Sequence, residues 1–275
     1  MLQLAGKTVL ITGGARGLGF ELARMCAADR ATVLIVDASA EHLARAVESL
    51  RSEGADVHAF VHDVTDRSAC YALERRIAAE LGPVHVLINN AGVVHKGDFL
   101  EADDEAWRHT VDVNLNGVMW MMRAFMPSMI ARREGHVVNV GSVLGLASAG
   151  GAAVYCATKH ALVSLTEAVR FELLERGCSG VSLTLACPGF TNTGMFHGVQ
   201  TGALFRPAAT RDTATAIYRA LRRRARITIY PYRFRLVAQL YALTPHWLWM
   251  LMTRMFGVHR AMDTHRASDR EGGAR

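Results

Sequence analysis

The chain has 275 residues, of which 51% are hydrophobic and 20% are charged, a composition typical of a folded globular protein and not of a disordered one. The net charge is +6, but residues 219–275 hold 12 arginines against three acidic residues, a local charge of +9 that leaves −3 for residues 1–218. A uniformly basic nucleic-acid-binding protein is therefore not expected, whereas a local anionic partner of the basic end, such as a membrane surface, fits this distribution.

Short apolar runs of strand length alternate along the chain with longer segments of helical periodicity. Because the strand-like runs are apolar throughout, both faces of their sheet should be buried, as in a parallel sheet covered by helices. The alternation predicts an α/β fold with a doubly wound, Rossmann-type parallel sheet of about seven strands. We predict strands at 7–12, 32–36, 57–61, 84–89, 136–140, 181–186 and 226–230, and helices at 17–28, 40–53, 66–81, 107–129 and 155–176.

The domain organisation follows from the absence of a linker or repeat before residue 219. We expect one Rossmann-type domain over 1–231, an apolar helical extension over 232–266 and a disordered polar end at 267–275. The five cysteines are scattered without CxxC spacing, and the chain opens on a strand-like run. We therefore expect a cytoplasmic protein with reduced thiols, no metal site and no secretory signal.

The turn between the first predicted helix and the second strand carries Arg30, where glycine is usual. A left-handed backbone at this position would cost a non-glycine residue roughly 1 kcal/mol. A different turn geometry is the alternative.

A glycine-rich turn follows the first strand and opens the first helix. Glycines at Gly13, Gly17 and Gly19 allow a tight turn and a close approach of the backbone to a diphosphate, which the free N–H groups of the helix would face. The GxxxGxG spacing is a weak signal by itself, and its place between a strand and a helix strengthens it. We predict nucleotide binding here, with Arg16 and Leu18 in the same turn.

Two acidic residues end the second and third strands. Asp37 lies about 20 residues past the glycines, where a carboxylate accepts hydrogen bonds from adenosine ribose hydroxyls and repels a 2′-phosphate, which favours NAD over NADP. Asp63, followed by Val64, is a candidate acceptor for the adenine amino group. The alternative for Asp37 is the N-cap of the following helix, and for Asp63 it is a cap of the segment at Asp66.

Tyr155 and Lys159 lie four residues apart on a predicted helix, which places both side chains on one face. An ammonium near a phenol favours the phenolate, so we expect Lys159 to lower the tyrosine pKa from about 10 and make Tyr155 an acid or base near neutral pH. A YxxxK pattern alone is common. Here it occurs with the glycine-rich turn, an Asn-Asn-Ala-Gly loop at 89–92 and Ser142.

This set of motifs resembles the short-chain dehydrogenase/reductase family over about residues 5–230. The resemblance implies hydride exchange between a nicotinamide and an alcohol or carbonyl, with assembly as dimers or tetramers through the long helices at 107–129 and 155–176. The matching elements are TGGARGLG at 12–19, Asp37, Asp63-Val64, NNAG at 89–92, Asn114 in VNLNG, Ser142, Tyr155 with Lys159, and Pro188-Gly189 with Thr191 and Thr193.

The resemblance also implies roles for these residues. Tyr155 would exchange the substrate proton, Ser142 would hydrogen-bond the substrate oxygen, and Lys159 would hold the nicotinamide ribose. Asn114 would position a water that links Lys159 to solvent; its alternative role is to satisfy backbone groups within a helix. The cofactor contacts implied are Asn90 along the nicotinamide ribose, Ala91 in the same loop, Gly92 leaving room for the cofactor, Pro188-Gly189 turning the sixth strand toward the nicotinamide, and Thr191 and Thr193 near its carboxamide or the diphosphate.

The predicted substrate pocket is apolar. Leu144 and Phe196 are the candidate contacts, and the segment 195–205 is an apolar lid with glycine hinges. Such a pocket favours a hydrophobic alcohol or ketone over a sugar or an acid. His95 and His197 are candidate polar contacts, with a surface position as the alternative for each.

The segment 236–253 contains eighteen residues without a charged side chain. Its length just permits a membrane span of about 20 residues, but Pro245 favours two short helices broken near 244–245. Tryptophans and flanking arginines suit a peripheral membrane contact through 232–257, at the inner face of the membrane. An arm packed over the substrate cleft or a partner subunit is the alternative. The segment loosely resembles the C-terminal extensions of family members that act on lipids.

We therefore expect an NAD-dependent oxidoreductase that interconverts a lipophilic secondary alcohol and its ketone, with a steroid-, retinoid- or long-chain-like substrate. The alternative is a non-catalytic nucleotide-binding regulatory or structural protein on the same fold. The complete set Asn114, Ser142, Tyr155 and Lys159 argues against that alternative, because a nucleotide sensor needs no proton relay.

Overall fold

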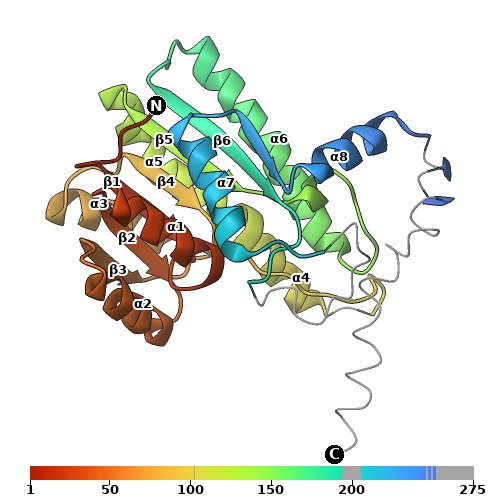
Figure 1. Cartoon of the computed structure of the whole chain (residues 1–275), viewed down its shortest axis with the longest axis horizontal. Helices are drawn as coiled ribbons and strands as arrows, with labels where there is room; N and C mark the ends of the chain where they lie inside the picture. The colour runs from red at the N-terminus through yellow and green to blue at the C-terminus, as the bar shows by residue number, and fades with distance from the viewer. Residues whose placement is uncertain (102, 194–205, 246, 249, 252–275) are drawn as a thin grey trace, which may run out of the picture.

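The computed structural model describes residues 1–101, 103–193, 206–245, 247–248 and 250–251 of the chain. Its centre is a seven-stranded parallel sheet in the order β3-β2-β1-β4-β5-β6-β7 (Figure 1). The order reverses between β1 and β4, which makes their carboxyl ends the switch point of a doubly wound sheet. The strands are β1 (Thr8–Thr12), β2 (Thr32–Asp37), β3 (Val57–Val61), β4 (Val86–Asn89), β5 (Gly135–Val140), β6 (Val181–Pro188) and β7 (Ile227–Tyr230).

Helices cover both faces of the sheet, as the apolar strands predict. Alternate β1 residues face opposite layers: Val9 and Ile11 pack with α1, α2 and α7, whereas Leu10 packs with α3, α5 and α6. The predicted doubly wound α/β fold is confirmed. The helices are α1 (Gly17–Ala28), α2 (Ala40–Ser52), α3 (Arg67–Glu80), α4 (Asp104–Val111), α5 (Gly117–Arg132), α6 (Ala153–Glu175), α7 (Thr210–Arg222) and α8 (Arg233–Leu243).

Two helical features differ from the sequence prediction. The helix predicted at 107–129 is two helices, α4 and α5, joined by a π-helical turn at Asp112–Asn116. Helix α7 was not predicted, although its buried residues Ile217 and Leu221 follow one another at helical spacing.

Arginine occupies left-handed positions after three helices. Arg30 has φ +60°, so the alternative turn geometry is wrong, and Arg133 and Arg224 adopt φ +54° and +50° after α5 and α7. This conformation ends a helix by satisfying its last carbonyls, and it is usually given to glycine. The backbone N–H of Arg30 accordingly donates to the carbonyl of Ala27.

The C-terminal part contains the predicted break. Helix α8 ends at Leu243, directly before Thr244-Pro245, and the described residues from 247 to 251 are again helical. In the described part of the chain, no helix combines the length and apolarity that a bilayer span needs. The division of the chain after residue 231 stays a prediction, and residues 252–275 lie outside the described residues.

His136 is a fully buried titratable residue in the sheet. It lies on β5 with Nδ1 2.7 Å from the Ser182 hydroxyl and Nε2 3.1 Å from the Thr184 hydroxyl, both on β6. Burial, and secondly the charge of Arg224, lowers the pKa of His136 from 6.5 to about 3. The neutral imidazole is therefore built into the fold.

This burial predicts a stability loss on acidification. In the unfolded chain this histidine is protonated below about pH 6.5, and in the folded chain only near pH 3. The contribution of the neutral His136 to the free energy of unfolding is therefore fully present above pH 6.5 and is lost as the pH falls toward 3. Between about pH 7.5 and 5 this site costs about 2 kcal/mol. Urea unfolding at both pH values should show a larger loss for the wild type than for His136→Gln, which does not titrate. Equal losses would contradict this assignment.

Candidate active site

The candidate site lies at the carboxyl ends of the central strands, around the switch point between β1 and β4 (Figure 1). The loops after β1, β4, β5 and β6 converge there because all strands run in the same direction. The motif residues predicted from the sequence lie on these loops and on the helices that follow them.

The glycine-rich turn is folded tightly against the start of α1. Gly13 and Gly17 have φ of +61° and +55°, and a Cβ on Gly19 would lie 2.1 Å from the carbonyl oxygen of Gly13. These positions therefore require glycine. Arg16 is the N-cap of α1, and its side chain has no oxygen to accept the N–H groups of the first turn, which remain suited to an anion.

Asn90 joins the loop after β4 to this turn. Its side-chain nitrogen donates to the carbonyls of Thr12 and Gly13, both at 3.0 Å, while the Thr12 hydroxyl accepts the N–H groups of Asn90 and Ala91 at 3.1 Å. The amide hydrogens of Asn90 are thus directed to the backbone, and its oxygen is the atom suited to a ribose. The ribose contact stays a prediction.

Asp37 ends β2 without capping the next helix. Its Oδ1 accepts the Ser39 N–H at 3.1 Å, and Ser39 is the N-cap of α2, accepting the His42 N–H at 3.2 Å. The N-cap alternative for Asp37 is wrong, because Ser39 already supplies the cap. The carboxylate has a second oxygen that a ribose could engage.

The same division holds at the end of β3. Asp66 is the N-cap of α3 and accepts the Ala69 N–H at 2.9 Å, whereas Asp63 accepts the Thr65 N–H at 2.9 Å in the preceding turn. The cap is therefore Asp66 itself. Val64 is buried and closes on Gly117, whose Cβ would lie 2.8 Å from a Val64 methyl group.

Tyr155 and Ser142 form a buried hydroxyl pair. Tyr155 is 5% exposed on α6, and Ser142, two residues after the end of β5, hydrogen-bonds its hydroxyl. Ser142 in turn accepts the N–H of Leu144 at 3.1 Å, which fixes its orientation. The predicted substrate contact Leu144 belongs to the same apolar cluster as Tyr155.

The expected lowering of the tyrosine pKa by Lys159 does not appear. Burial raises the pKa of Tyr155 to about 12, and the bond from Ser142 only opposes that rise. Burial also lowers the pKa of Lys159 to about 8. The Lys159 ammonium lies 5.6 Å from the centre of the phenol ring and donates to the Val140 carbonyl at 3.0 Å. Desolvation therefore outweighs their mutual attraction.

The amide of Asn114 is used by the loop after β4. Its oxygen accepts the Val93 N–H and its nitrogen donates to the Val93 carbonyl, both at 2.8 Å. The alternative role was to satisfy backbone groups within a helix; the amide does bond backbone groups, but they belong to the loop after β4 and not to a helix. A Cβ on Gly92 would lie 3.3 Å from the Asn114 oxygen and 3.7 Å from Lys159 Nζ, so these three residues converge.

The turn after β6 is held by the C-terminal segment. The Gly189 N–H donates to the Tyr230 carbonyl at 2.7 Å, and a Cβ on Gly189 would lie 2.5 Å from the ring of Phe234 on α8. The sequence reasoning missed this contact. The signal available in the sequence was a phenylalanine placed between two arginines, Arg233 and Arg235; in the structure Phe234 is buried.

The two threonines of this turn differ. The Thr191 hydroxyl is buried and donates to the Gly189 carbonyl at 3.1 Å, so it serves the turn itself. Thr193 instead approaches the glycine-rich turn, because a Cβ on Gly17 would lie 3.4 Å from the Thr193 Cβ. Thr193 is therefore the better placed of the two for a diphosphate.

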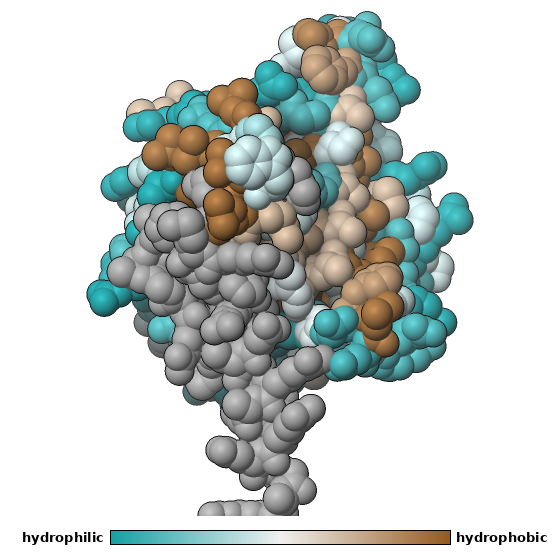
Figure 2. All heavy atoms as spheres, turned by 90° about the vertical axis from the view of Figure 1, so that its right-hand side faces the viewer, coloured by the Kyte–Doolittle hydropathy of each residue, from teal (hydrophilic) through white to brown (hydrophobic). Residues whose placement is uncertain are grey.

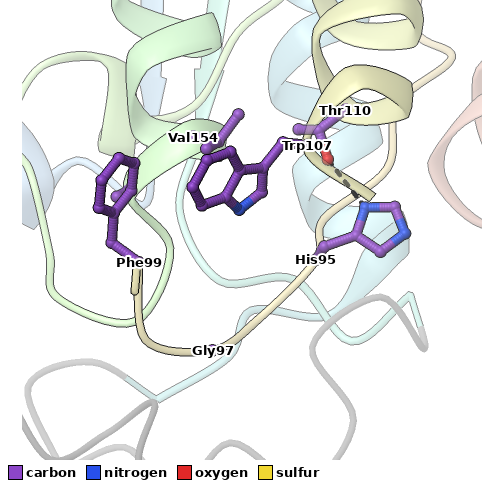
Figure 3. Close-up of a pocket in the computed structure, with 7 residues that line it drawn as sticks. His95, Gly97, Phe99, Trp107, Thr110 and Val154 are labelled. Carbon is purple, nitrogen blue, oxygen red and sulfur yellow. Dashed lines mark hydrogen bonds between the residues drawn. The ribbon is translucent and has the colours of Figure 1, made fainter. Parts of the chain in front are cut away.

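A small pocket lies between α4, the 95–99 loop and the start of α6 (Figure 3). His95 Nδ1 lies 2.8 Å from the Thr110 hydroxyl, which donates to the Ala106 carbonyl. His95 therefore donates from Nδ1. Phe99 and Trp107 stack beside it with ring centres 4.6 Å apart. The other candidates, Phe196 and His197, lie outside the described residues.

The residues present fit a dinucleotide. The glycine turn and the first N–H groups of α1 suit a diphosphate, and the Asp37 carboxylate suits ribose hydroxyls. Tyr155 supplies an exchangeable proton beside these elements. Among the described residues, no three His, Cys, Asp or Glu side chains gather as a metal site would need.

Comparison with known proteins supports this arrangement. The chain is 37% identical over 201 residues to human epidermal retinol dehydrogenase 2, covering 73% of this chain and 65% of that protein. It is 35% identical over 192 residues to mouse 17-beta-hydroxysteroid dehydrogenase 13, covering 70% of this chain and 63% of that protein. The match therefore spans less than two thirds of the length of either relative.

A solved structure has the same fold. A short chain dehydrogenase/reductase from Burkholderia phymatum, in complex with NAD, superimposes with a TM-score of 0.81 at 30% identity, covering 87% of this chain and 94% of that one. The sequence model of the family described as short chain dehydrogenase matches residues 7–203. The chain belongs to the short chain dehydrogenase family.

Proposed function

We propose that this protein is an NAD-dependent oxidoreductase that interconverts a lipophilic secondary alcohol and its ketone. The observation that carries the proposal is the buried Tyr155–Ser142 hydroxyl pair beside Lys159, at the same sheet edge as the glycine-rich turn. A regulatory protein that only bound the nucleotide would need the turn but not this pair.

The proton is handled by Tyr155. In ketone reduction its hydroxyl gives a proton to the substrate oxygen and becomes a phenolate, and in alcohol oxidation the phenolate accepts the proton of the alcohol. Ser142, oriented by the Leu144 N–H, hydrogen-bonds the same oxygen. The nicotinamide supplies the hydride chemistry when bound, and the protein supplies placement. With a pKa of about 8, Lys159 is mostly protonated at neutral pH, and its charge favours the phenolate that oxidation requires.

NAD is the proposed cofactor, with NADP less favoured. The Asp37 carboxylate stands at the end of β2, where a 2′-phosphate would meet a charge of the same sign. The NAD complex of the structural relative supports a nicotinamide cofactor.

The proposed substrate is hydrophobic and steroid-, retinoid- or long-chain-like. Apolar side chains surround Tyr155, among them Val143, Leu144, Phe190 and Phe234. The relatives named retinol dehydrogenase and 17-beta-hydroxysteroid dehydrogenase support this class. We also propose that the protein is cytoplasmic and assembles as a homodimer or homotetramer through α5 and α6. It would contact a membrane peripherally.

Replacing Tyr155 with phenylalanine removes the proton carrier and leaves the ring in place. Turnover of apolar secondary alcohols, followed by NADH absorbance, should fall about 100- to 10,000-fold, the range of general acid–base catalysis. NADH binding, followed by fluorescence, should be retained. Tyr218→Phe is the control, because Tyr218 bonds Asp29 in the opposite helical layer. Full turnover by Tyr155→Phe would show that another group carries the proton.

The raised tyrosine pKa predicts opposite pH trends for the two directions. Below a pKa of about 12, the phenolate fraction rises tenfold per pH unit, while the phenol stays nearly fully protonated. Oxidation should therefore accelerate between about pH 6 and 8, and reduction should not. Above the Lys159 pKa of about 8 the rise in oxidation should flatten, as the ammonium is lost. Initial rates in both directions test this, and a pH-independent oxidation rate would contradict it.

Replacing Asp37 with serine should relax the cofactor preference. Removing the carboxylate abolishes repulsion of the 2′-phosphate, so the NADP-to-NAD ratio of kcat/KM should rise about tenfold or more. Asp63→Ser, at the end of the neighbouring strand, should leave that ratio unchanged. A ratio that shifts equally in both variants would mean that overall charge, and not Asp37, sets the preference.

A further inference from the structure

Helix α8 is apolar on two sides. Phe234 and Val237 point inward: Phe234 is 3% exposed, packs over Gly189, and belongs with Val237 to the cluster around Tyr155. The helix is thus anchored to the candidate site through one side. Figure 1 shows α8 at the edge of the molecule, beyond β7.

The other side of α8 faces outward with a second apolar stripe. Leu236, Leu240 and Leu243 follow at spacings of four and three residues and are 61%, 40% and 83% exposed. Trp247, after the break at Pro245, is 69% exposed. Figure 2 faces this side of the molecule and shows hydrophobic side chains gathered on it. Contiguous exposed apolar surface marks an interaction site.

Arginines adjoin the outward stripe. Arg233 and Arg235 are exposed on the first turn of α8, and Arg233 donates to the Arg206 carbonyl at 2.7 Å, which brings a third exposed arginine to the same place. Residues 213–262 contain nine arginines and no aspartate or glutamate. A second copy of this segment would therefore offer no counter-charge, whereas anionic headgroups would.

We propose that the outward face of α8, formed by Leu236, Leu240 and Leu243 with Trp247 and the three arginines, binds the surface of an anionic lipid bilayer. The leucines enter the boundary between headgroups and acyl chains, tryptophan lies at headgroup level, and the arginines pair with lipid phosphates and carboxylates. The helix lies in the plane of the surface.

Docking in this way brings the candidate site to the membrane. Because the inward side of the same helix packs on the Tyr155 cluster, a bilayer on the outward side lies one helix diameter from that cluster, about 10 Å. A hydrophobic alcohol dissolved in lipid would then reach the site without crossing water. This last step rests on the proposed function, whereas the lipid contact does not.

Flotation of the full-length protein with vesicles tests the contact. Binding is expected to phosphatidylcholine vesicles that contain about a third phosphatidylserine, and about fivefold weaker binding for Arg235→Gln. Leu243→Glu should weaken partitioning into the vesicles about tenfold or more, because a leucine that would enter the boundary between headgroups and acyl chains is replaced by a charged residue. The matched control is Leu174→Glu, also near the end of a helix and 76% exposed, on α6. The control should float as the wild type does.

Several outcomes would overturn the proposal. They are absent flotation of the wild type, equal binding to pure phosphatidylcholine, and equal losses for Leu243→Glu and Leu174→Glu. Light scattering should give the same mass for the wild type and Leu243→Glu; a lower mass for Leu243→Glu, without a change in flotation, would assign the face to a second copy. Flotation requires no turnover, so failure of the lipid contact leaves hydride transfer untouched, and the reverse also holds.

Discussion

Burial of the Tyr155 phenol beside the Lys159 amine is the constraint on which the rest of the site depends. In water these groups would be a neutral phenol and a fully charged ammonium, and attraction between them would favour the phenolate. In the protein, desolvation moves the two pKa values apart: that of Tyr155 rises from 10.0 to about 12, and that of Lys159 falls from 10.5 to about 8. The phenol therefore stays protonated at neutral pH, and forming the phenolate requires positive charge held close to it.

The scaffold holds this pair from several directions. Helix α6 carries both residues. The carbonyl of Val140, the last residue of β5, accepts a hydrogen bond from the lysine ammonium, and Ser142 hydrogen-bonds the phenol. The π-helical turn places Asn114 so that its amide clamps the loop after β4, and π-helical turns are frequent at functional sites. The Phe234 ring of α8 packs against Gly189 in the turn after β6. One helix thus contributes to the candidate site and presents an apolar stripe to the exterior.

The sequence was sufficient for features set by local patterns, and insufficient for those set by long-range packing. The apolar strand runs and the glycine-rich turn can be recognised from the sequence by their periodicity and spacing. The parallel sheet, and the meeting of the motif loops at one edge of it, could therefore be predicted. Helix α7 was missed although Ile217 and Leu221 lie four residues apart on its buried face, so its pattern was also readable from the sequence. The tyrosine pKa was misjudged because four-residue spacing reports proximity to Lys159 and says nothing of burial. The contact between the Phe234 ring and Gly189 could not be predicted, because these residues are far apart in the sequence and only the fold brings them together.

Ionisation of Tyr155 in the cofactor-free protein tests most directly the claim that burial controls this site. The tyrosinate absorbance of the wild type minus that of Tyr155→Phe isolates this one phenol. Because its pKa is raised to about 12, the difference should show almost no phenolate from Tyr155 at about pH 10, where an ordinary tyrosine is half ionised. A full tyrosinate signal by about pH 8 would mean that the lysine charge, and not desolvation, sets the proton affinity of this phenol.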